Sequence, residues 1–193
     1  MKILIPYQKE RIEGAIAFFA SKHKEQAKQN LSQTALYKYL AFFDFKSLND
    51  SGEPALGLTY IAMPFGPVPQ EIYKEKKYID SKYYKFHPKG NSVIIIPTSH
   101  KPDYLEYFSE YDMELMNDLI EIFATLGKSS SIMSEASHEN NEWGKAWRKT
   151  RNKNPNSIIN MADHFDNLEE KYKNNTASIA EEHFFIYQKL HAN

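Results

Sequence analysis

The segment Met63-Pro64-Phe65-Gly66-Pro67-Val68-Pro69 constrains the fold of this chain more than any other stretch. Proline fixes φ and lacks a backbone N–H, so three prolines in seven residues exclude a helix interior and a central strand. Glycine permits the positive φ that tight turns need. The apolar Met63, Phe65 and Val68 are interleaved with these turn-forming residues, which is not typical of a flexible linker. We therefore expect an ordered corner with Phe65 or Val68 buried, either a packed structural element or a preformed binding edge.

Composition places the chain among globular proteins. Its 193 residues fit one domain, and 41% hydrophobic and 14% aromatic residues are enough for a substantial core. The absence of cysteine excludes disulfides, Cys-zinc sites and thiol nucleophiles. We find no signal peptide and no apolar run of membrane-spanning length, so we expect a cytoplasmic protein without membrane contact. The formal net charge of -1 gives no general attraction for nucleic acid.

The first half of the chain predicts two helices and a small sheet. Apolar residues recur at helical spacing over about 9–24. A second helix, capped by Asn30 or Ser32 and running to about Leu48, is apolar on nearly every face and should be central to the fold. The extended run 57–62 leads into the proline corner and a short helix ending near residue 77. Strands at 83–87 and 92–96 flank a turn and predict a β-hairpin, which the run at 57–62 could join as an antiparallel sheet.

The second half is predicted to be mostly helical. Helices are expected at about 112–126, 129–137, 140–150 and 176–190, with a polar break at 151–157. Ser129, Ser130 and Ser131 suggest a helix N-cap rather than a nucleophile. The fold class that follows is α+β: a helix-rich single domain with a small antiparallel sheet.

Two clusters could carry chemistry. His138 and Glu142 are four residues apart and adjoin Glu139, which would suit a metal-dependent hydrolase, but further ligands are missing and Glu142 stands where a zinc protease has its second histidine. No catalytic triad or cofactor fingerprint emerges, so we expect no enzyme, metal or cofactor. The second cluster alternates lysines with Tyr73, Tyr78, Tyr83 and Tyr84, a pattern able to hold single-stranded nucleic acid. A solvated lysine-rich face over half-buried tyrosines explains it equally well.

Two blocks of sequence resemble the Panacea domain, or SocA-like antitoxin, family. The first is Thr34-Ala35-Leu36-Tyr37-Lys38-Tyr39-Leu40-Ala41-Phe42-Phe43-Asp44-Phe45, continued by 57–62 and by Phe65-Gly66-Pro67-Val68-Pro69-Gln70-Glu71-Ile72-Tyr73. The second is Ser131-Ile132-Met133-Ser134-Glu135-Ala136-Ser137-His138-Glu139, with Trp143 after it. Order and spacing agree over about 11–147, which leaves a C-terminal helical extension at about 158–190. One departure is Ala41, where the family is expected to have tyrosine.

This resemblance implies an antitoxin that binds and neutralises a protein toxin encoded beside it. Some family members carry a separate DNA-binding domain in front, for which this chain has no room before Arg11. Members also occur in prophages, so a phage accessory role that uses nucleic acid stays an alternative. A homo-oligomer and a link to a protease are also left open.

The resemblance and the aromatic content together suggest a set of partner-binding residues. Those carried by the two blocks are Lys38, Asp44, Phe65, Pro67, Val68, His138 and Trp143. The aromatic side chains beside the proline corner add Tyr73, Tyr78, Tyr83 and Tyr84, because aromatic residues dominate interface centres. We expect an alanine substitution at one or more of these four tyrosines to weaken toxin binding while the fold stays intact.

Overall fold

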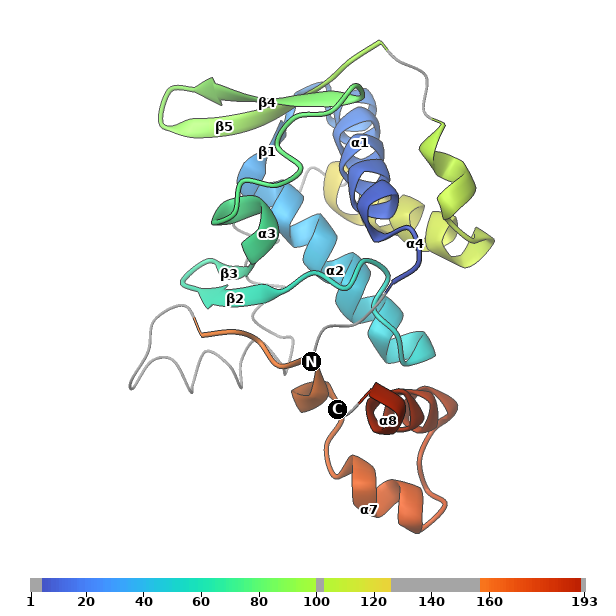
Figure 1. Ribbon diagram of the computed structural model, residues 1–193. Coiled ribbons are helices and arrows are strands. Elements are labelled where there is room, and N and C mark those ends of the chain that lie inside the picture. Colours follow the sequence, from blue (N-terminus) through green and yellow to red (C-terminus); the bar gives the residue numbers. More distant parts are fainter. Residues whose placement is uncertain (1–4, 100–102, 126–156, 192–193) are drawn as a thin grey trace.

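The structure is a computed structural model that describes residues 5–99, 103–125 and 157–191. Two long helices, α1 (Gln8–Ala27) and α2 (Gln33–Ser51), lie at its centre, and α4 (Glu110–Ile120) packs beside them, followed by a π-helical turn η2 (Glu121–Thr125). Two small antiparallel sheets flank this helical core (Figure 1). The predicted α+β class is confirmed. Within the described ranges, no helix is both long and apolar enough to cross a membrane.

Helix α2 is the predicted central helix. Its N-cap is Ser32, whose side chain accepts a hydrogen bond from the backbone N–H of Ala35 at 3.2 Å. It ends at Gly52, which has φ 82° and donates its N–H to the carbonyl of Leu48. The helix therefore runs three residues past the predicted end at Leu48, because the left-handed glycine sets its terminus.

The first sheet has the strand order β1-β5-β4. Strands β4 (Tyr84–Lys89) and β5 (Ser92–Pro97) form the predicted hairpin, with Phe86 opposite Ile95. The third strand is β1 (Leu31–Ser32), directly before α2. Our prediction that the run at 57–62 joins this hairpin was wrong, since that run finds a partner closer to it in sequence.

The second sheet contains the proline corner. Strand β2 (Tyr60–Met63) pairs with β3 (Gly66–Pro69), and all four residues of β3 are buried. Phe65 lies in the connecting turn with 73% of its surface exposed, whereas Val68 is 9% exposed. The expected ordered corner is confirmed, with Val68 as its buried side chain. Helix α3 (Gln70–Tyr73) follows and is shorter than predicted.

A third segment completes this second sheet. Ala62 donates its N–H to the carbonyl of Ser157 at 3.0 Å, and Ile159 donates to the carbonyl of Tyr60 at 2.8 Å. The chain at 157–159 thus lies antiparallel to β2, with Ile158 opposite Ile61. This pairing was not predicted from the sequence. The helices expected at 129–137 and 140–150 lie outside the described residues.

The C-terminal part forms a helical hairpin of α7 (Leu168–Lys173) and α8 (Ile179–His191), where one helix at 176–190 was predicted. Figure 1 shows this hairpin against the C-terminal end of α2. The contact is close at Gly52, where an added Cβ would lie 2.4 Å from the carbonyl oxygen of Ala180. A hydrogen bond of 2.8 Å joins Nδ1 of His183 to the carbonyl of Ser51, and Phe184 is buried.

Candidate functional site

One buried carboxylate on α2 holds the loop that precedes β2. Asp44 accepts hydrogen bonds from the backbone N–H groups of Leu56 at 2.5 Å, Gly57 at 3.1 Å and Leu58 at 3.2 Å. The hydroxyl of Tyr60 donates a fourth bond at 2.8 Å. Full burial raises the pKa of Asp44 to about 6, although each of these bonds acts to lower it. The position of this loop is therefore fixed from inside the protein.

Side chains from two other helices satisfy the remaining backbone groups of the loop. Both carboxylate oxygens of Glu71 on α3 accept from the N–H of Thr59, at 3.0 and 3.1 Å. Gln8 on α1 donates to the carbonyls of Leu56 and Gly57, at 2.8 and 3.1 Å, and Arg11 donates to the carbonyl of Ala55 at 3.0 Å. Residues 55–59 are thus held by polar contacts from three helices, which makes them a rigid surface.

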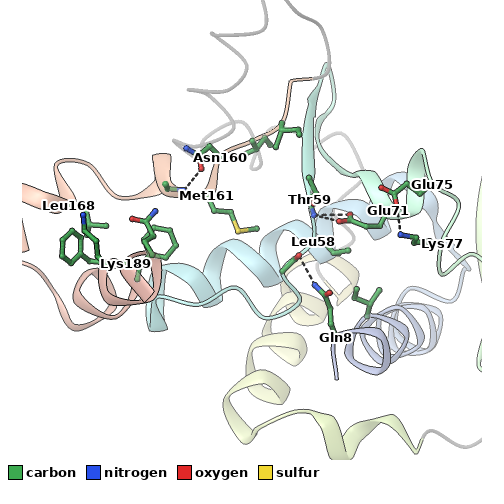
Figure 2. Close-up of a pocket in the computed structure, with 18 of the residues that line it drawn as sticks. Gln8, Leu58, Thr59, Glu71, Glu75, Lys77, Asn160, Met161, Leu168 and Lys189 are labelled. Atoms are coloured by element: carbon green, nitrogen blue, oxygen red, sulfur yellow. Dashed lines mark hydrogen bonds and ion pairs between the residues drawn. The ribbon is translucent and has the colours of Figure 1, made fainter. Parts of the chain in front are cut away.

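This rigid loop forms the floor of a groove of about 1180 Å³ (Figure 2). One side is formed by α3 and the residues after it, including Glu71 and Lys77, and the other by the C-terminal hairpin. The segment 158–162 and the start of α1 complete the lining. The apolar lining side chains are Ile12, Leu58, Tyr78, Ile158, Ile159, Met161, Ala162, Leu168, Phe184 and Phe185.

Four of the five charged side chains that line this groove form ion pairs with one another. Lys77 lies 2.7 Å from Glu75, and Lys189 lies 3.1 Å from Glu169 at the far side. The Glu71 carboxylate accepts hydrogen bonds from the backbone N–H of Thr59. A groove that combines apolar side chains with mostly paired charges suits a polypeptide segment better than a small charged substrate.

Two of the expected binding residues lie inside the protein. Lys38 is 1% exposed and Asp44 is fully buried, so neither is part of the surface of the free protein. Burial lowers the pKa of Lys38 to about 8. Its ammonium forms no hydrogen bond or ion pair with any residue in the described ranges. Asp44 instead has the structural role given above.

The four candidate tyrosines fall into two groups. Tyr83 and Tyr84 are core residues, 7% and 0% exposed, and burial raises the pKa of Tyr84. For these two, the expectation that alanine leaves the fold intact does not hold, and we expect loss of stability instead. Tyr73 is 38% exposed beneath the ammonium of Lys76, and Tyr78 is half-buried. Only the second pair is placed to contact a partner or to stack on a base.

The remaining candidates divide by position. Phe65 is exposed at the tip of the β2–β3 hairpin, whereas Pro67 and Val68 are buried and shape the strand beneath it. His138 and Trp143 lie outside the described residues, as do Glu139 and Glu142 of the metal alternative. Within the described part of the chain, no three His, Asp or Glu side chains come together in a way that could hold a metal ion.

Several groove residues escaped the sequence analysis. Gln8 and Glu71 have ordinary polar identities, and only their contacts with a distant loop give them a role. Ser157-Ile158-Ile159 carries a sequence signal, since two β-branched apolar residues beside a polar break are typical of a short strand. That signal could have indicated the third segment of the second sheet.

Comparison with known proteins gives one match. A family model described as "Antitoxin SocA-like, Panacea domain" matches residues 36–144, more than half of the chain. This range contains α2 from residue 36 onward, both β-hairpins, the 55–59 loop and α4, whereas the C-terminal hairpin lies beyond it. No curated protein and no solved structure matches the chain.

Proposed function

The chain belongs to the family of SocA-like antitoxins with a Panacea domain, and we propose that it neutralises a protein toxin by direct contact. The observation that carries this proposal is the match over residues 36–144, which includes most of the central helix and the proline corner that suggested the same family. We infer a non-enzymatic role in the cytoplasm. The gene beside this one is the natural source of the toxin.

The surface around the proline corner is the contact region that we favour. Phe65 exposes 73% of its surface from a hairpin whose strand β3 is buried, so the ring is presented by a rigid support. Tyr73 follows on α3 with an aromatic face partly open. Interfaces of standard size draw most of their binding energy from a few such aromatic anchors. His138 and Trp143 remain candidates within the same proposal.

The test is co-expression with the product of the neighbouring open reading frame. We expect growth rescue and co-purification of the two proteins. Phe65→Ala should weaken the complex by about 1–3 kcal/mol and leave the melting temperature unchanged. Ile179→Ala is the matched control, because Ile179 is an apolar residue 88% exposed on the C-terminal hairpin.

Each result has a defined meaning. If the wild-type protein neither binds nor rescues, the antitoxin proposal is wrong for this chain. If binding occurs and Phe65→Ala binds the toxin as tightly as Ile179→Ala does, the contact surface lies elsewhere.

Two further measurements address the oligomeric state and the fate of the toxin. Light scattering on the free protein and on the complex tests self-association. The half-life of the toxin in cells with and without this protein tests delivery of the toxin to a protease.

A further inference from the structure

The second sheet has one edge that is closed to further strands. In β2, Tyr60 and Ala62 direct their backbone hydrogen bonds towards 157–159. Because these directions alternate along a strand, Ile61 and Met63 face β3, and their partners there are Val68 and Gly66. Pro67 and Pro69 consequently face outward. Neither has a backbone N–H, so the outer edge of β3 offers no donor to an incoming strand.

The opposite edge of this sheet has backbone groups to offer. The carbonyl of Ser157 and the N–H of Ile159 are bonded to β2, so the N–H and carbonyl of Ile158 point away from it. Neither group of Ile158 has a partner within the described ranges, and its side chain is 60% exposed. The next outward N–H belongs to Asn160, which has extended backbone angles (φ −85°, ψ 114°).

This edge borders the groove. Ile158 and Asn160 both line it, and Leu58 and Met161 contribute apolar surface to its floor. Figure 2 shows Asn160 and Met161 beside the rigid loop at Leu58 and Thr59. An extended segment placed along the edge would gain two backbone hydrogen bonds from Ile158 and one from the N–H of Asn160. Its side chains would alternate between the two faces of this sheet.

We propose that the edge at Ile158 and Asn160 binds an extended segment of the toxin by β-strand addition. The inference rests on the proposed function and specifies how the toxin is held. Main-chain hydrogen bonds would supply affinity without demanding one sequence.

Ile158→Pro is the decisive variant. It removes the outward N–H at a position where an edge strand tolerates proline, because that N–H makes no bond within the described fold. Ile158→Val is the control, since it keeps the N–H and most of the side chain. The probe is the purified product of the neighbouring open reading frame, titrated against each variant. We expect Ile158→Pro to weaken binding at least tenfold and Ile158→Val to change it less than threefold.

A second measurement does not depend on the variant folding. In the wild-type protein, exchange of the Ile158 amide proton should slow at least tenfold when the toxin binds. If the wild-type protein binds the toxin and neither the exchange nor the Ile158→Pro affinity changes, strand addition is wrong while the proposed function stands. If Ile158→Pro abolishes a dimer of this chain and leaves toxin affinity intact, the edge serves a second copy and the inference is also overturned. If the toxin does not bind the wild-type protein, both proposals fail.

Discussion

Replacing Gly52 by alanine tests how closely the C-terminal hairpin packs against α2. Gly52 has φ 82°, a left-handed conformation that costs about 1 kcal/mol or more for a residue with a Cβ. The new Cβ would also lie 2.4 Å from the carbonyl oxygen of Ala180 and 3.0 Å from the backbone nitrogen of Phe184. Since ordinary contacts begin at 3.4 Å, α8 has to move by roughly 1 Å to accommodate it.

The magnitude follows from what this movement disrupts. Phe184 is 1% exposed, and loss of its burial costs about 2 kcal/mol. The hydrogen bond from His183 to the carbonyl of Ser51 contributes about 1 kcal/mol. With the backbone strain, Gly52→Ala should lower the free energy of unfolding by about 4 kcal/mol.

Gly90→Ala is the matched control. Gly90 also has a positive φ, 58°, but an added Cβ there meets nothing within 4 Å. Only the strain of about 1 kcal/mol should appear. Urea unfolding followed by circular dichroism gives both values, and hydrogen exchange should show faster exchange in α8 for Gly52→Ala alone. Equal destabilisation by the two variants would refute the argument that α8 is packed closely against α2.

Three further predictions concern buried ionisable groups. Asp44→Ala leaves three backbone N–H groups and the hydroxyl of Tyr60 without an acceptor. Removal of the buried carboxylate offsets part of this cost, so we expect the free energy of unfolding in urea to fall by about 3 kcal/mol. An unchanged urea midpoint would contradict this. Lys38→Met should raise the free energy of unfolding at pH 7 by about 1–3 kcal/mol, because below pH 8 the folded wild-type protein holds a buried charged ammonium. The gain should disappear as pH rises from about 8 to 10.5, since the Lys38 ammonium of the folded protein loses its proton across this range. Burial lowers the pKa of His23 from 6.5, so the folded state favours its neutral form and stability should fall as pH drops below 6.5; His23→Gln, compared with wild type by thermal unfolding from pH 7 to 5, should show a shallower fall.

Local sequence signals predicted the central helix and the hairpin of the first sheet correctly. Ser32 as an N-cap, the apolar faces of α2 and the turn between β4 and β5 each act within a few residues. The proline corner was recognised as ordered and as excluded from a central strand. Its strand character was missed, because prolines at outward positions are compatible with an edge strand, and orientation cannot be read from composition.

The parts that sequence reasoning missed depend on contacts between distant segments. Gln8 reaches the 55–59 loop across more than forty positions, and residues 157–159 return to β2 from about a hundred positions away. The apolar faces of α2 predicted a central helix, but Lys38 and Asp44 were still expected at the surface, since charged residues are mostly exposed. Tyr83 and Tyr84 were expected to be half-buried or available to a partner, but both lie in the core, because their burial depends on packing against segments distant in sequence.

The two prolines of β3 have a consequence for the assembly of many copies. A sheet grows into a filament when one edge of each copy pairs with the opposite edge of the next, a head-to-tail contact that never closes. Here the outer edge of β3 lacks N–H donors, so the open edge at Ile158 of one copy finds no matching edge on another. Among the described residues, the self-pairing left to this sheet joins two open edges, which closes as a two-fold pair and stops. The sheet can therefore present unpaired backbone to a partner without serving as a template for fibrils.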